Sequence, residues 1–129
     1  MGHLGLTPQS VHALGGFKVQ GRGDDAARII EDAKALEAAG VFALVLELVP
    51  AELAEQITAE LSIPVIGIGA GAKCDAQVLV WTDLMGITKN APKLAKAYRN
   101  LRIEMLNAAK EYANDVSSGQ FPGPEQTFH

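Results

Sequence analysis

The sequence predicts an α/β fold in which parallel strands alternate with helices. Two apolar runs, "VFALVLEL" at 41–48 and "IPVIGIGAG" at 63–71, are short and nearly continuous, as in strands covered on both faces. Segments with a helical period precede and follow the first run. Because strands and helices alternate along the chain, we expect parallel strands joined by right-handed crossovers.

The region before the first run predicts a strand, a loop and a helix. Residues 1–25 are rich in glycine and lack a sustained helical period, which indicates the end of a strand followed by a long loop. Asp24 or Asp25 makes a fair N-cap for a helix that ends at Gly40. The apolar side chains share one face of this helix: Ala26, Ile29, Ile30, Ala33 and Leu36.

Shorter elements follow Pro50. This proline opens a short helix in which apolar residues recur every four positions, at Leu53, Ile57 and Leu61. The run at 63–71 ends in glycines, and "QVLVW" at 77–81 indicates a further buried strand.

A long helix is predicted over 91–116. Its apolar residues alternate in steps of four and three: Leu94, Tyr98, Leu101, Met105, Ala108 and Tyr112. Such a stripe is typical of packing against the rest of the fold, and the alternative is a seam with a partner helix. The Pro- and Gly-rich tail, 117–129, is expected to lie over a surface.

Composition argues against several classes of protein. The chain has 129 residues, enough for one domain but too few for a complete eight-stranded α/β barrel of about 250 residues. Its net charge of −4 gives no basic footprint for nucleic acid. The start of the chain does not resemble a signal peptide, and no apolar run approaches the roughly 20 residues that cross a bilayer. With one cysteine, Cys74, no intramolecular disulfide can form, and we expect a cytoplasmic protein.

The glycines of "IPVIGIGAGA" fit the loose pattern of a dinucleotide-binding loop. Gly67, Gly69 and Ala72 hold the three positions of that pattern. The pattern requires a helix that faces the pyrophosphate, but only "AKCDA" separates Gly71 from the next strand. A backbone that passes close to a ligand or to a neighbouring strand is the better explanation for these glycines.

Glu47 is the one carboxylate in the apolar run 42–50. In a strand, Leu46 and Leu48 face opposite to Glu47, so in a barrel Glu47 could point inward near the strand's C-terminal end, where barrel enzymes hold their catalytic groups. A carboxylate between apolar walls is a stronger base than one in water. The alternative is a glutamate that turns outward and pairs with a surface lysine. The pattern alone leaves both readings open.

Other polar residues give weaker signals. His3 lies among small and apolar residues, where a histidine is more often structural than catalytic. His12 and His129 are weaker candidates for a catalytic role than His3. Lys18 and Arg22 could hold an anion, although a solvated loop is the simpler reading. No spacing typical of a metal site occurs along the chain.

Four motifs in order along the chain carry a resemblance to a known enzyme family. The motifs are "MGHLGLTPQSV", "LVLELVP", "IPVIGIGAG" and "FPGPEQTFH". Together they resemble ketopantoate hydroxymethyltransferase, over essentially the whole chain but over the C-terminal half of that enzyme only. The resemblance implies the C-terminal half of a (β/α)₈ TIM barrel, with residues 1–129 as a single partial barrel domain from the end of strand five through strand eight, the terminal helices and the tail.

The resemblance also implies an activity. Enzymes of this family are one-carbon hydroxymethyltransferases of pantothenate and coenzyme A biosynthesis. They transfer a hydroxymethyl group from 5,10-methylenetetrahydrofolate to 3-methyl-2-oxobutanoate, giving ketopantoate, and a Mg²⁺ ion chelates the 2-oxo acid. The family further implies a large homo-oligomer, a decamer.

Site residues follow from the same resemblance. Glu47 aligns with the glutamate that removes the proton from C3 of the keto acid, which favours the base reading. His3 aligns with a histidine that contacts the bound keto acid. Gly69 and Gly71 are candidates for the folate contact by position alone. The Mg²⁺ ligands and a substrate lysine of the family lie upstream of the matching region, so no metal ligand is expected in this chain.

The chain departs from the family pattern at two mild positions. Ala76 stands where the family usually has glycine, and Gln126 stands where it usually has histidine. Activity is expected to require the N-terminal half, in the same chain or as a separate one. The alternative function is a non-catalytic half-barrel module, or relic fragment, that oligomerises through its open edges and the apolar stripe from Leu94 to Tyr112.

Overall fold

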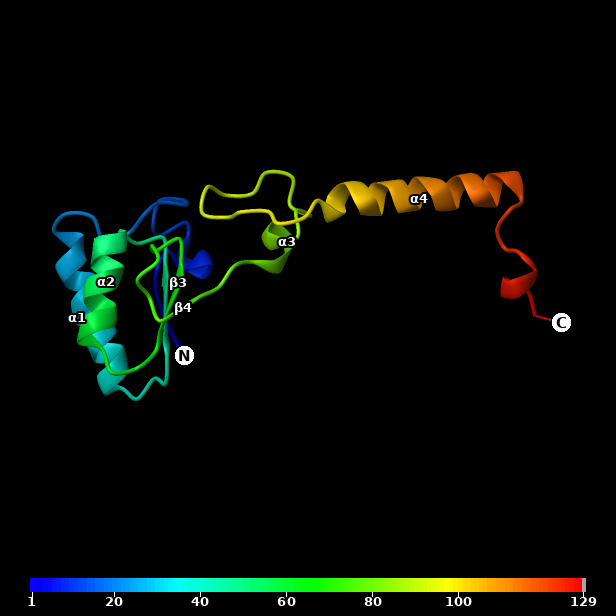
Figure 1. Ribbon diagram of the computed structural model, residues 1–129. Helices are drawn as coiled ribbons and strands as arrows, with labels where there is room; N and C mark the ends of the chain where they lie inside the picture. The colour runs from blue at the N-terminus through cyan, green and yellow to red at the C-terminus, as the bar shows by residue number, and fades with distance from the viewer. Residues whose placement is uncertain (129) are drawn as a thin grey trace. The chain divides into compact units, whose positions relative to one another are not determined.

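The computed structural model describes residues 1–128 and confirms the α/β fold (Figure 1). Four parallel strands form one sheet in the order β1-β2-β3-β4, consistent with half of a TIM barrel. The chain divides into two compact units, residues 1–79 and a second unit from residue 80 onward. The first unit contains β1 (Gly2–Gly5), a 3-10 turn η1 (Pro8–Ser10), α1 (Asp25–Ala38), β2 (Leu44–Glu47), α2 (Ala51–Glu60), β3 (Val65–Ile68) and β4 (Ala76–Gln77). A single domain over 1–129 stays a prediction.

One face of the sheet packs against α1 and α2, which lie side by side (Figure 1). Leu44, Leu46 and Val65 point to this face and are fully buried. They join the apolar residues of both helices in one core: Ile29, Ala33, Val49, Leu53, Ala54, Ile57 and Ala70. The helical periods predicted from the sequence therefore place their apolar faces as expected.

The opposite face of the sheet is more open. His3 pairs in register with Val45, and Gly5 pairs with Glu47. Because side chains alternate along a strand, His3, Val45 and Glu47 share this second face, and all three are half-buried. In a complete barrel this is the face that lines the interior. The sequence prediction that Glu47 lies opposite to Leu46 is confirmed.

The strand predicted at 77–81 is shorter than expected. Only Ala76 and Gln77 pair with β3, and Trp81 already begins a short helix, α3 (Trp81–Leu84). Val78 and Val80 are exposed, at 48% and 51% of their surface. In the described residues β4 is the edge of the sheet, so no further strand covers this apolar run.

The helix predicted over 91–116 begins ten residues late. The second unit contains α3, α4 (Leu101–Ser118) and a 3-10 turn, η2 (Pro124–Gln126). The N–H groups of Tyr98 and Leu101 donate to the carbonyls of Leu84 and Met85, at 2.8 and 3.0 Å. This segment therefore bonds to the end of α3 instead of continuing the helix, and Leu94 and Tyr98 of the predicted stripe lie outside α4. None of the helices in residues 1–128 is both long and apolar enough to span a bilayer.

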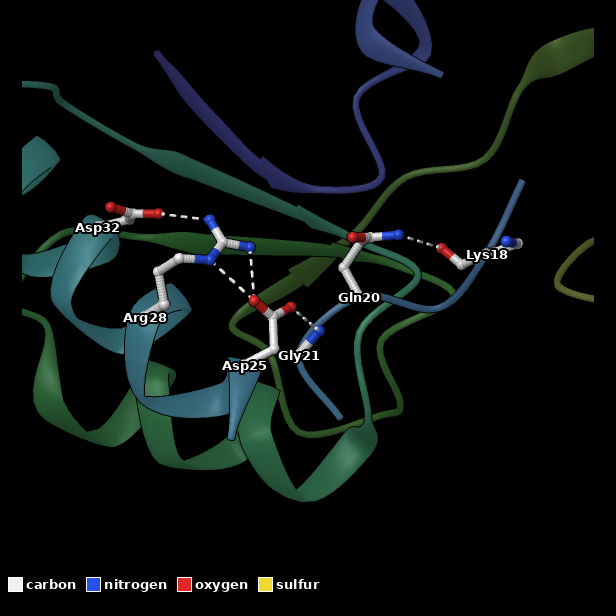
Figure 2. Close-up of polar contacts among 6 residues, drawn as sticks. All are labelled: Lys18, Gln20, Gly21, Asp25, Arg28 and Asp32. Carbon is white, nitrogen blue, oxygen red and sulfur yellow. Dashed lines mark hydrogen bonds and ion pairs between the residues drawn. The ribbon is translucent and has the colours of Figure 1, made fainter. Parts of the chain in front are cut away.

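Asp25 fastens the loop that precedes α1, as Figure 2 shows. Asp24 is the N-cap residue by position but makes no side-chain cap hydrogen bond. The Asp25 carboxylate accepts the Gly21 N–H at 2.8 Å and an Arg28 N–H at 2.8 Å, and Arg28 also contacts Asp32 at 3.1 Å. The Gly21 hydrogen bond, and then Arg28, hold the pKa of Asp25 below its ordinary value of 3.8.

We expect Asp25→Asn to lower the free energy of unfolding by about 0.5–1 kcal/mol at pH 7, a small amount because the side chain is partly exposed. Since the folded-state pKa lies below the ordinary value, this stabilisation is present above pH 3.8 and is lost as the pH falls through the folded-state pKa. Urea unfolding at pH 7 and pH 3 measures both quantities. Asp32→Asn, which removes one exposed contact with Arg28, is the matched control. An equal deficit at both pH values would contradict the prediction.

Candidate active site

Glu47 and His3 meet on the open face of the sheet. Glu47 is the last residue of β2, and His3 lies on the neighbouring strand β1. The Nε2 atom of His3 lies 3.1 Å from Oε2 of Glu47, within hydrogen-bond distance. Their side chains are 33% and 16% exposed, so the pair is accessible to a small molecule. The structure thus brings together the two residues that the sequence singled out, and their roles stay predictions.

The backbone on both sides of Glu47 is held by neighbouring strands. The Leu6 N–H donates to the Glu47 carbonyl at 2.8 Å, and the Leu48 N–H donates to the Ile68 carbonyl at 3.0 Å. Gly5 lies so close to Glu47 that a Cβ at this position would collide with the Glu47 carbonyl oxygen. These contacts fix the carboxylate at the carboxyl end of the strand, on the face that carries His3.

Such an arrangement can accept a proton. A carboxylate acts as a general base when a substrate places an acidic C–H within hydrogen-bond reach of it. The half-buried position of Glu47 limits its contact with water, and the His3 ring gives it a polar neighbour that can also contact a bound substrate. The geometry therefore fits abstraction of a proton from a small carbon acid.

The glycine loop after β3 has a packing role. A Cβ on Gly71 would lie 2.5 Å from the Cβ of Ala51, because the loop passes directly over the first turn of α2. In the described residues no helix begins between Ile68 and Ala76, so the dinucleotide-binding pattern lacks its helix. The folate contact at Gly69 and Gly71 stays a prediction.

A surface cavity that sequence reasoning did not predict lies near the end of β2. Its volume is about 770 Å³, and it lies between the loop 19–23 and the start of α2. Arg22 lines it, as do Glu52 and Gln56. Lys18 instead offers its carbonyl to the Gln20 side chain at 3.0 Å (Figure 2). His12 is exposed in the loop after η1, and His129 lies outside the described residues.

The described residues do not supply the ligands of a magnesium site. Within residues 1–128, no three His, Cys, Asp or Glu side chains gather closely enough to hold a metal ion. Mg²⁺ prefers oxygen ligands in near-octahedral geometry, and Glu47 with His3 does not supply such a set.

Comparison with known proteins shows the family of this chain. The family described as ketopantoate hydroxymethyltransferase matches residues 1–124. The chain belongs to this family. That membership agrees with the parallel α/β sheet and with the motifs that carry the sequence resemblance.

Three similar relatives are each named 3-methyl-2-oxobutanoate hydroxymethyltransferase. The protein of Acidothermus cellulolyticus is 59% identical over 129 residues, which cover 99% of this chain and 48% of the relative. The proteins of Kosmotoga olearia and a Nocardioides species are 55% and 54% identical; these matches cover 99% of this chain and 49% and 44% of those relatives. The chain thus spans about half the length of the curated relatives that it matches.

Proposed function

We propose that this chain forms one half of an enzyme that transfers a hydroxymethyl group from 5,10-methylenetetrahydrofolate to 3-methyl-2-oxobutanoate. The product is 2-dehydropantoate (ketopantoate), an intermediate of pantothenate biosynthesis. The observation that carries the proposal is the half-buried Glu47 carboxylate on the open face of the sheet, 3.1 Å from His3. The names of the similar relatives support the same activity.

Glu47 is the general base of the proposed reaction. It takes the proton from C3 of the keto acid, and the electron pair left on C3 forms the new carbon–carbon bond to the one-carbon unit of the folate. The two bonds from that carbon to the folate nitrogens break, water supplies the hydroxyl oxygen, and tetrahydrofolate leaves with its two nitrogens protonated. His3 contacts the bound keto acid and orients it against the carboxylate. Glu47 lies at the carboxyl end of β2, and His3 lies on the same face of the neighbouring strand β1. Barrel enzymes assemble their sites at the carboxyl ends of the strands.

The proposed reaction also needs a Mg²⁺ ion, contacts to the folate and an assembly with the N-terminal half. Mg²⁺ supplies Lewis-acid activation of the 2-oxo acid when bound. The family resemblance implies that its ligands lie in the N-terminal half, and the proposal assigns them there. Gly69 and Gly71 are the proposed folate contacts, and a cytoplasmic homo-oligomer, a decamer as in the family, is the proposed assembly.

The test is a turnover assay with 3-methyl-2-oxobutanoate, methylenetetrahydrofolate and Mg²⁺. The purified chain is assayed alone and after mixing with the N-terminal half of the Acidothermus cellulolyticus relative; this mixture is called the reconstituted enzyme below. We expect turnover in the mixture only. Turnover by the chain alone would contradict the assignment of the metal ligands. Absence of turnover in both samples, from folded material, would contradict the proposed function.

A second candidate function, a non-catalytic assembly module, is favoured by α4. No residue of this helix is buried, and several of its large apolar side chains are exposed by 43% or more: Ile103, Met105, Leu106, Tyr112 and Val116. An apolar helix surface of this kind is typical of a binding face. Two results together would favour this candidate over the enzyme. The purified chain would sediment as a stable homodimer, and the reconstituted enzyme would bind neither Mg²⁺ nor keto acid measurably.

A further inference from the structure

Leu48, the residue directly after Glu47, has an unusual backbone conformation. Its φ angle is +49°, and it is the single non-glycine residue with a positive φ within the described residues. A side chain with a Cβ is disfavoured in this left-handed region, and leucine is not among the residues that enter it readily. Strain of this kind persists only where surrounding contacts over-determine it, and it concentrates at functional sites.

The left-handed residue breaks the alternation of side chains at the end of β2. In a regular strand, Glu47 and Val49 would point to the same face, because they are two residues apart. Instead, Val49 is 3% exposed within the core formed with Leu46 and α2, whereas Glu47 points to the opposite face and contacts His3. The turn at Leu48 thus allows Val49 to enter the core without drawing the Glu47 carboxylate in with it.

Hydrogen bonds hold both peptide groups of Leu48. Its N–H donates to the Ile68 carbonyl at 3.0 Å, and its carbonyl accepts the Gln20 N–H at 2.9 Å. Gln20 belongs to the loop that Asp25 fastens through the Gly21 N–H (Figure 2). The conformation of Leu48 is therefore fixed from β3 on one side and from the loop before α1 on the other.

We propose that Leu48 is a positioning residue, whose left-handed backbone keeps the Glu47 carboxylate on the substrate face at His3. The inference rests on the proposed function, in which Glu47 is the base. A residue that resists the left-handed region would extend the strand by one position. The alternation would then either draw Val49 out of the core to the face of Glu47, where it would crowd the carboxylate, or turn Glu47 toward the core and away from His3.

Two substitutions separate positioning from packing. Leu48→Ile keeps the same atoms and apolar character but adds β-branching, which disfavours the left-handed region strongly. Leu48→Asn removes apolar character but tolerates that region well. Both variants are assayed in the reconstituted enzyme, and kcat is expressed per folded molecule, with the folded fraction taken from thermal unfolding. If residue 48 acts through packing, kcat should be higher for Leu48→Ile than for Leu48→Asn. If it acts by positioning Glu47, kcat should be higher for Leu48→Asn.

We expect Leu48→Ile to lower kcat about tenfold or more while the KM for keto acid stays within about twofold, since the base and not the binding site is displaced. Leu48→Asn is expected to keep kcat within about threefold of the parent, because its backbone conformation is retained. Equal kcat values for the parent and Leu48→Ile, or a lower kcat for Asn than for Ile, would overturn the proposal.

Hydrogen exchange provides a readout that does not depend on activity. The amides of Leu48 and Gln20, whose hydrogen bonds require the left-handed turn, are expected to exchange about tenfold faster in Leu48→Ile and at the parent rate in Leu48→Asn. If the reconstituted parent lacks turnover, the proposed function fails, while exchange still decides whether residue 48 sets this geometry. Unchanged exchange in Leu48→Ile overturns the inference and leaves the proposed function intact.

Discussion

Glu47→Gln is expected to lower kcat of the reconstituted enzyme by about 10²–10⁴-fold, the usual contribution of a general base. The amide keeps the size and hydrogen-bonding capacity of the side chain, including a partner for His3 at 3.1 Å, but it cannot accept the proton from C3. The KM for keto acid should therefore change little, because binding does not depend on the missing charge alone. Steady-state kinetics with varied keto acid measure both quantities.

Glu31→Gln is the matched control for this substitution. Glu31 is an exposed glutamate of α1, so the same change of charge and shape is made away from the site. We expect its kcat to equal that of the parent. Normal turnover by Glu47→Gln would show that another group removes the proton and would leave the His3–Glu47 contact with a structural role.

The helices and strands of the first unit other than β4 were predictable because their patterns are local. Apolar runs without alternation indicated β2 and β3, and the helical spacing of Ile29 and Ala33 indicated α1. The second unit was less predictable. Tyr98 and Leu101 continue a helical pattern, yet their N–H groups are taken by carbonyls of Leu84 and Met85, which are distant in the sequence. Such tertiary hydrogen bonds override local propensity and leave no periodic signal.

The candidate site was predictable in part. The apolar neighbours of Glu47 indicated that it faces opposite to Leu46 but left open whether it points inward, and the resemblance favoured Glu47 as the base and singled out His3. Their proximity depends on the register between β1 and β2. The positive φ of Leu48 could not be predicted, since leucine carries no preference for that region. The deviation shows in the structure one residue further on, where the buried Val49 breaks the alternation that begins at Leu44.

Gly5→Ala is expected to destabilise the fold where β1 passes close to the backbone of Glu47. Gly5 has a φ of +85°, and an added Cβ would collide with the Glu47 carbonyl oxygen and lie 2.8 Å from Cγ1 of Val49. Neither group can retreat, because the Glu47 carbonyl accepts the Leu6 N–H and Val49 is in the core. We expect a loss of about 3 kcal/mol or more in the free energy of unfolding, from overpacking added to an unfavourable φ. Urea unfolding measures this loss.

Gly40→Ala separates the two contributions. Gly40 has a φ of +90°, close to that of Gly5, but no atom lies within 4 Å of the position that a Cβ would take. It should therefore show the backbone penalty alone, about 1–2 kcal/mol. The additional loss of unfolding free energy in Gly5→Ala, relative to Gly40→Ala, measures the close approach of β1 to the end of β2. The kcat of Gly5→Ala should also fall, because β1 carries His3. Equal losses for the two variants would mean that the strands separate at little cost and that Gly5 does not fix the distance between His3 and Glu47.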